Sequence, residues 1–332
     1  MMIRFFKNSY LPQHITLFML AVLLWIPAFL SPTNHLIFEK SYTSPLFPAF
    51  MEMLGKKHLL VTLFNFAVVF SGAILANYIL EKNDLIPRNS LLAAFFFILL
   101  LSQVDFSIHN PGYIVVFILL TMLLYILGIY KIPEPYIQVF NSGLLISIAS
   151  FFYFPSAVFL LFVWIIFVTY RLYYWREWVI LPIGAITLFI LIWTYYFLSD
   201  QMKEALEGYS AFLNFKMTFE PTPDLSVSKI IVYMIIILLF LWSLLKILRH
   251  YGDKILIVRK RVTVLIWFFL LMFISLLLSG FDLLTHQVLF MASMSLLMCI
   301  GISYAKKLIW LDIFTGGLTI LILVEKYLIF IL

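Results

Sequence analysis

Charged side chains are scarce in this sequence, because Asp, Glu, Lys and Arg together make up only 11% of its 332 residues. An average soluble domain carries about 25% of these residues. Hydrophobic residues account for 64% of the chain, and no water-soluble fold could bury that much apolar surface. The composition therefore excludes an ordinary soluble enzyme and indicates a protein of the lipid bilayer.

The sequence also has little cysteine and no clustered histidine. Cys299 is the single cysteine and lies in an apolar run, so no disulfide can form within the chain. Because metal-dependent oxidases and proteases need histidines at close helical spacing, neither class is expected. The sequence identifies no cofactor. A Walker sequence is also absent, which excludes ATP hydrolysis by a P-loop. The six histidines are isolated along the chain: His14, His35, His58, His109, His250 and His286.

What the chain does contain is a series of long apolar runs from Ile15 to Leu332. A helix needs roughly 20 apolar residues to cross the hydrocarbon core, and only structures that satisfy their own backbone can do so. We therefore predict an all-α, polytopic bundle of about eleven transmembrane helices, forming a single integral membrane domain over residues 1–332. The predicted helices are 15–31, 58–80, 91–105, 113–130, 138–152, 155–170, 178–198, 229–248, 262–280, 286–304 and 308–331.

The connections between these helices carry opposite charges on the two sides. If the N-terminus is cytoplasmic, the basic loop residues fall inside, most acids fall outside, and the C-terminus lies outside. The basic residues are then topology signals, with a cluster at 246–261 also suited to anionic lipid, and the net charge of +6 needs no nucleic-acid partner. The predicted inner set is Lys82, Arg88, Lys131, Arg171, Arg176, Lys306, Lys307 and the cluster from Lys246 to Arg261.

Two predicted outer segments are longer than ordinary connections. Residues 31–57 form the first outer loop, in which apolar residues between prolines and a terminal lysine pair predict a short juxtamembrane helix on the bilayer surface. Residues 199–228 form the second outer loop, which begins with charges on one helix face and continues into a proline-rich stretch. Because long loops often carry function, we expect docking or catalysis at these segments.

Carboxylates at the outer boundary are the candidate catalytic groups. Glu39 stands beside Lys40 and four residues after His35, and Asp105 ends the third predicted helix shortly before His109. A carboxylate at the lipid–water boundary can act as a general base towards a hydroxyl acceptor, and a nearby cation can stabilise a phosphate leaving group. The alternative is that these acids simply end their helices in water.

Three other features have interpretations that involve helix contacts. Asp312 lies one turn inside the last helix, where it can pair with Lys306 and Lys307 at the interface or take part in proton coupling. The pairs Ser142-Gly143 and Gly316-Gly317 predict close approach between neighbouring helices.

The stretch Phe140–Leu161 runs from a helix of small residues through the turn Phe151-Phe-Tyr-Phe-Pro155 into a returning helix. It resembles the corresponding hairpin of membrane glycosyltransferases of the GT-C superfamily, and the resemblance covers roughly the first two hundred residues. It implies a polyprenyl-phosphate-linked sugar donor at the outer face and a catalytic acid at Glu39. The chain departs from that family in having no second acid beside Glu39 and no cation in the turn.

The chain as a whole is also similar to an uncharacterised family of bacterial polytopic inner-membrane proteins. The matching features are the opening Met2–Ser9, the stretch Asn141–Pro155 and Trp175-Arg-Glu-Trp178. This resemblance implies a multi-pass protein of the bacterial inner membrane.

Two hypotheses for function follow, and they belong to different classes. The first is a GT-C-like glycosyltransferase of the cell envelope, with Glu39 as base, Asp105 assisting, and His35, Lys40 and His109 near the donor phosphate. The second is a non-catalytic membrane subunit that binds envelope proteins through its outer loops. A transporter ranks third, because ionisable residues within the apolar runs are few.

Overall fold

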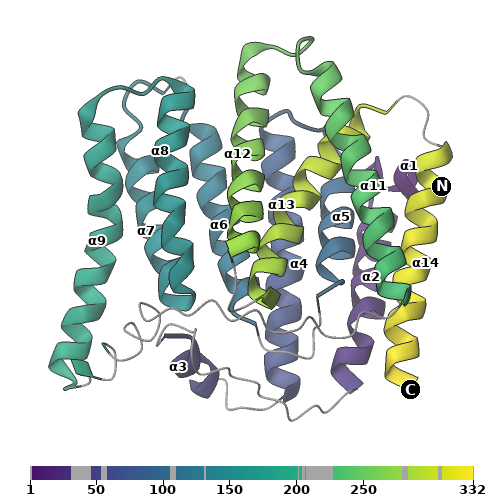
Figure 1. Cartoon of the computed structure of the whole chain (residues 1–332), viewed down its shortest axis with the longest axis horizontal. Coiled ribbons are helices and arrows are strands. Elements are labelled where there is room, and N and C mark those ends of the chain that lie inside the picture. Colours follow the sequence, from purple (N-terminus) through teal and green to yellow (C-terminus); the bar gives the residue numbers. More distant parts are fainter. Residues whose placement is uncertain are drawn as a thin grey trace.

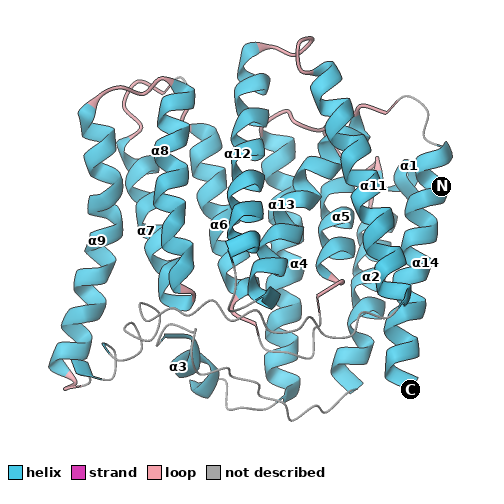
Figure 2. Ribbon diagram, viewed as in Figure 1, coloured by secondary structure: helices cyan, strands magenta, loops and turns pink. Residues whose placement is uncertain are grey.

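The computed structural model describes residues 2–30, 46–53, 58–104, 110–130, 132–200, 202–203, 206, 227–278, 283–305 and 309–331. Every regular element within these ranges is a helix, as Figures 1 and 2 show, which confirms the all-α class. In chain order they are α1 (Met2–Phe6), α2 (Leu11–Leu30), α3 (Leu46–Met53), α4 (His58–Lys82), α5 (Leu92–Leu101), α6 (Gly112–Gly128), α7 (Tyr136–Phe152), the 3₁₀ helix η1 (Phe154–Val158), α8 (Phe159–Tyr170), α9 (Trp175–Leu198), α11 (Val227–His250), α12 (Leu256–Leu278), α13 (Leu283–Ser303) and α14 (Ile309–Ile331).

Each of the eleven predicted helix positions is occupied by a helix. The largest difference is at α12, which begins at Leu256 instead of residue 262, because its basic first turns extend the helix beyond the apolar run. Among the described residues, six helices are long and apolar enough to cross a membrane, so the chain is a multi-pass membrane protein. They are α2, α4, α9, α11, α12 and α13. Helices α5, α6, α7 and α8 are apolar but shorter, and the total of about eleven spans stays a prediction.

The centre of the bundle is built around α13 and α5. Helix α13 packs against α5, α6, α11 and α12, and every residue of α5 from Leu92 to Leu101 is buried. A helix that is apolar on all sides is stable where other helices surround it. The ten residues of α5 are therefore a core element of the bundle instead of a lipid-facing one.

Small residues allow two of the helix pairs to approach closely. A Cβ atom at Gly143 of α7 would overlap the carbonyl oxygen of Leu181, and one at Gly184 of α9 would overlap that of Phe140. Likewise, α11 and α13 cross where Gly301 faces Ser243. The predicted close packing at Ser142-Gly143 is thus confirmed. The prediction for Gly316-Gly317 is wrong, because a Cβ at either residue would meet no atom within 4 Å.

The two ends of the bundle differ in charge. One end of the bundle, at the top of Figure 1, is defined here as the basic edge. It carries the connections 83–91, 129–135, 171–174 and 251–255. The basic residues predicted to be cytoplasmic gather here wherever the structure describes them. The opposite edge, at the bottom of Figure 1, carries α3, the turn between α7 and α8 and the start of α13. The positive-inside rule predicts that the opposite edge faces outward.

Helix α3 falls within the predicted segment 31–57 and lies at the opposite edge (Figure 1). Its Phe50 ring packs 5.1 Å from the ring of Phe64 on α4 and 5.9 Å from that of Phe152 on α7. Phe47 and Met51 are buried against Val61 in a small separate cluster. These contacts attach α3 to the bundle by one apolar face, as an amphipathic helix beside a bilayer requires.

Candidate functional site

The five residues predicted as catalytic or substrate-binding, Glu39, Asp105, His35, Lys40 and His109, lie outside the described residues. The structure does describe the helices on either side of these segments. Helix α2 ends at Leu30, α5 ends at Leu101, and α6 begins at Gly112, all at the opposite edge in Figure 1. The side chains described at this edge are therefore the ones from which a candidate site can be built.

A buried histidine connects three helices at this edge. The imidazole of His286 on α13 lies with Nε2 2.7 Å from the hydroxyl of Tyr153 and with Nδ1 2.6 Å from the hydroxyl of Ser275 on α12. His286 is 6% exposed and Tyr153 is 2% exposed. Both ring nitrogens are therefore satisfied by hydroxyl groups inside an apolar bundle.

The end of α7 explains how Tyr153 reaches this position. Helix α7 ends at Phe152, Tyr153 adopts an extended conformation with φ −149°, and Pro155 follows in the first turn of η1, where its missing N–H is tolerated. The chain then turns into η1, and the Tyr153 ring packs with its centroid 5.4 Å from that of His286. The turn noted in the sequence thus delivers a phenol to the histidine.

The hydrogen-bond pattern is that of a proton relay. A neutral imidazole has one N–H donor and one nitrogen acceptor, so one of the two hydroxyls donates to His286 and the other accepts from it. If the Tyr153 proton moved to one ring nitrogen and the proton on the other nitrogen moved to Ser275, the group would stay uncharged only when Ser275 passed on its own hydroxyl proton and Tyr153 took up another. The group can therefore hold or transfer a proton at the opposite edge.

A second polar pair joins Thr285, the residue directly before His286 on α13, to Asn110. The side-chain oxygen of Asn110 accepts hydrogen bonds from the hydroxyl of Thr285 and from the backbone N–H of Gly112, both at 2.7 Å. A Cβ at Gly112 would lie 2.9 Å from that oxygen and 3.2 Å from the carbonyl oxygen of Thr285, so only glycine fits here without displacement. Asn110 therefore fixes the start of α6, directly after residues 105–109, against α13.

Gln287 extends the polar group to a third neighbour. Its amide nitrogen donates to the hydroxyl of Tyr233 on α11 at 2.8 Å. Glu325 on α14 is also buried, and Lys229 and Lys326 are the positive charges near it. Three consecutive residues, Thr285 to Gln287, thus form side-chain hydrogen bonds with α11, with α12 and with residues just before α6 and just after α7.

This polar group was missed by the sequence reasoning, which treated His286 as isolated. A signal was present, because Thr285-His-Gln287 places three polar residues together at the start of an apolar run. Among the residues that the structure describes, no three His, Cys, Asp or Glu side chains gather as metal ligands. The arrangement is therefore suited to hydrogen bonding and proton transfer.

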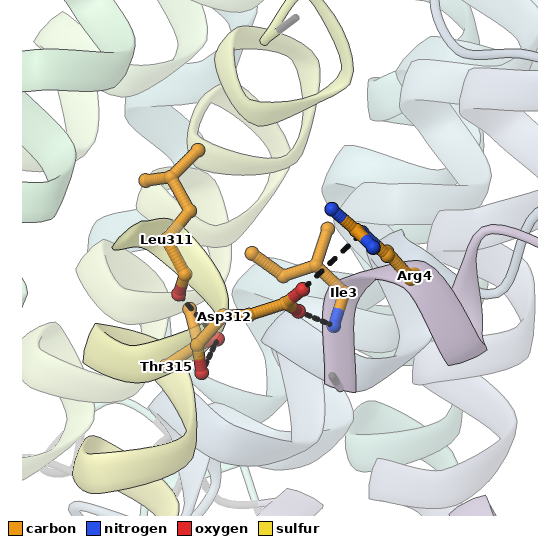
Figure 3. Close-up of polar contacts among 5 residues, drawn as sticks. All are labelled: Ile3, Arg4, Leu311, Asp312 and Thr315. Carbon is orange, nitrogen blue, oxygen red and sulfur yellow. Dashed lines mark hydrogen bonds and ion pairs between the residues drawn. The ribbon is translucent and has the colours of Figure 1, made fainter. Parts of the chain in front are cut away.

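Asp312 lies at the other end of the molecule, near the basic edge. Figure 3 shows its carboxylate accepting a hydrogen bond from the backbone N–H of Ile3 at 2.7 Å and lying 3.8 Å from Nε of Arg4. Lys306 and Lys307, the predicted partners, lie outside the described residues. The buried carboxylate of α14 therefore anchors the first turn of α1, across almost the whole length of the chain.

Replacing Asp312 by alanine is expected to release α1 from α14. A hydrogen bond to a charged group contributes about 1.5–3 kcal/mol, so the α1 contact should open roughly 10 to 100 times more often. A cysteine introduced at the fully buried Ile3 would report this opening by its rate of thiol labelling. The matched control is Asp253→Ala, an exposed acid at the same edge. Equal labelling rates in both variants would show that other contacts hold α1.

Comparison with known proteins identifies no relative of this chain: no family model, no curated protein and no solved structure matches it. The functional argument therefore depends on the fold and on the polar contacts described above.

Proposed function

We propose that this multi-pass membrane protein is a glycosyltransferase that takes a sugar from a polyprenyl-phosphate carrier at the outward-facing, opposite edge. The observation that supports the proposal is the buried group of Tyr153, His286 and Ser275 at that edge. Polar and ionisable side chains inside membrane spans are costly, and they are found chiefly where substrates or protons are handled. Glycosyl transfer to a hydroxyl acceptor requires a base at the outer boundary, and the buried polar group gives that edge a fixed support beside which a base can act.

The chemistry of the donor fits a site at the edge of a helical bundle. A polyprenyl chain is apolar and remains in the bilayer, whereas its phosphate and sugar lie at the lipid–water boundary. The outer faces of α2 and α9 offer exposed apolar side chains to the bilayer, among them Met19, Ile190 and Leu191. The donor could therefore approach from the lipid while the acceptor arrives from water.

In the proposed reaction, the acceptor hydroxyl oxygen attacks the anomeric carbon, and the bond from that carbon to the phosphate oxygen breaks. Glu39 accepts the proton of the hydroxyl, with Asp105 assisting, and polyprenyl phosphate leaves. His35, Lys40 and His109 stabilise the charge of the departing phosphate. His286 is a positioning residue in this scheme: with Tyr153 and Ser275 it supports the edge against which the reacting groups assemble.

The test of this proposal is the variant Glu39→Gln. Loss of a general base costs about 10²- to 10⁴-fold in rate, so transfer from a radiolabelled polyprenyl-phosphate sugar should fall at least about 100-fold in purified protein restored to lipid. Glu52→Gln is the matched control, because Glu52 is an exposed acid of α3 in the same outer segment. Equal activity of the two variants would remove Glu39 from the mechanism. An unaltered protein that releases no sugar from any lipid-linked donor would contradict the enzyme proposal.

A second candidate function is that of a non-catalytic subunit, and the position of α9 favours it. This helix packs mainly on α7, at one flank of the bundle in Figure 1. Its last turn exposes Tyr195, Phe197 and Leu198 at the opposite edge, each by more than 60%. A partner helix or an outer domain could cover this surface. Purification in mild detergent should then retain a second protein in fixed proportion, and a chain that elutes alone would count against this candidate.

A further inference from the structure

The end of α11, the start of α12 and the end of α13 meet at the basic edge in a shallow surface depression that encloses no cavity, so a ligand would lie on it and not inside it. It lies on the side of the molecule away from the proposed glycosyl-transfer site and takes no part in that reaction. Its polar and aromatic lining consists of His250, Tyr251, Lys254, Arg259 and Tyr304.

Two of these residues, Lys254 and Arg259, are cations. Among the residues that the structure describes, neither Lys254 nor Arg259 forms an ion pair with a carboxylate. The Nε atom of Arg259 is buried and has no hydrogen-bond acceptor. Because buried donors are almost always satisfied, a guanidinium in this position indicates a missing acceptor.

Tyr304 adds a hydroxyl hydrogen-bond donor to the two cations of this lining. Lys254 Nζ lies 4.4 Å from the centroid of the Tyr304 ring, and the ring of His250 lies 5.6 Å from it. Burial raises the pKa of the Tyr304 phenol, so its hydroxyl keeps its proton at neutral pH. His250 Nδ1 lies 3.0 Å from the carbonyl oxygen of Lys246 and donates to it, which leaves Nε2 as the ring atom able to meet a ligand. The lining therefore offers several donors and two positive charges, as phosphate oxygens require.

The apolar side chains around the depression favour a lipid over a soluble anion as its ligand. Ile247 and Val262 complete its lining. Beside it, Leu248 is 63% exposed, Ile255 67% and Leu256 52%, so apolar side chains suited to acyl chains border the cations. The candidate spans Ser228–His250 and Leu256–Leu277 end and begin at this turn. The depression is thus at the depth of lipid headgroups.

The local charge specifies the sign of the headgroup. Between residues 246 and 261 the sequence has six Lys and Arg residues and one acid, Asp253. Clusters of this kind on the cytoplasmic side of a span attract anionic lipids. We propose that the depression is a binding site for the phosphate of an anionic phospholipid of the cytoplasmic leaflet, held by Lys254, Arg259 and Tyr304.

The test compares phospholipid binding to the full-length protein and its variants by native mass spectrometry, using phosphatidylglycerol and phosphatidylcholine of identical acyl chains. Each cation near a headgroup contributes about fivefold in affinity, so the site should prefer phosphatidylglycerol by roughly 25-fold. The double variant Lys254→Gln/Arg259→Gln should lose this preference. The matched control Lys82→Gln/Arg88→Gln removes the same charge from an exposed part of the basic edge and should keep it.

Three results would overturn the proposal. The first is equal binding of the two lipids by the unaltered protein, and the second is an equal loss in the control variant. The third is complete displacement of phosphatidylglycerol by millimolar inorganic phosphate, which would identify the ligand as a soluble anion. If the double variant fails to fold, Lys254→Gln alone should still reduce the preference about fivefold, and an unchanged preference in that variant would equally contradict the site.

Discussion

Replacing Gly301 by alanine is expected to destabilise the bundle more than any other single-methyl change in the described residues. The added Cβ would overlap the side-chain and carbonyl oxygens of Ser243 and lie 2.6 Å from its Cα. Because two of these three atoms are backbone, no side-chain rotation can relieve the contact. The Ser243 hydroxyl also donates to the carbonyl oxygens of Leu297 and Met298, both at 3.0 Å, and would lose these bonds if α11 moved away.

The expected loss for Gly301→Ala is about 3 kcal/mol, the upper part of the range for overpacking a well-filled interior. Cys299 provides the measurement, since this single cysteine is fully buried and should react with a thiol-specific dye only when the bundle opens. A thermal scan of dye labelling in detergent should therefore show a lower midpoint for the variant. A midpoint equal to that of the parent would mean that the α11–α13 crossing is wrong.

Gly317→Ala is the matched control for this experiment. It adds the same methyl group to a helix interior, at a residue where a Cβ meets nothing within 4 Å. Alanine is favoured over glycine in helices by roughly 1 kcal/mol, so this variant should be as stable as the parent or slightly more so. If Gly301→Ala lowers the labelling midpoint and Gly317→Ala raises it, steric contact and not helix propensity determines the change in stability.

The second large effect is expected for His286→Leu. Leucine is similar in size but offers no hydrogen bond, so the buried hydroxyl of Tyr153 loses its bond to residue 286, and Ser275 loses its contact with Nδ1. Loss of a buried hydrogen bond of this kind costs about 1–3 kcal/mol. The thiol-labelling midpoint should fall accordingly, whereas His14→Leu, at an exposed position, should leave it unchanged.

A double-mutant cycle with Tyr153→Phe isolates the contact between the two residues. Tyr153→Phe removes only the hydroxyl, and the double variant Tyr153→Phe/His286→Leu leaves no unpaired phenol beside residue 286. The two losses should therefore be less than additive by about 1 kcal/mol. Strict additivity would show that Tyr153 and His286 act on stability independently, and it would remove the basis for a proton relay between them.

Only part of the candidate site could be predicted from the sequence. Reasoning from loops and charges pointed to the opposite edge, but it selected Glu39 and Asp105, which lie outside the described residues, and treated His286 as isolated. The partners of His286 are separated from it by 133 residues at Tyr153 and by 11 residues at Ser275. A single histidine in an apolar run carries no indication of which distant hydroxyl it will meet.

The helices, and the gathering of the loop cations at one edge, followed from the sequence alone. Each apolar run must satisfy its own backbone in lipid, so a helix follows from local composition alone, and the loop cations then gather at one edge. Which helices are buried, and which small residues lie where two helices meet, depended on how the whole bundle packs. Gly301 and Gly317 both lie in helices, yet only Gly301 is crossed by another helix. Likewise Asp312 meets the backbone of Ile3, 309 residues away, because long-range contacts depend on how all helices pack together and not on local sequence.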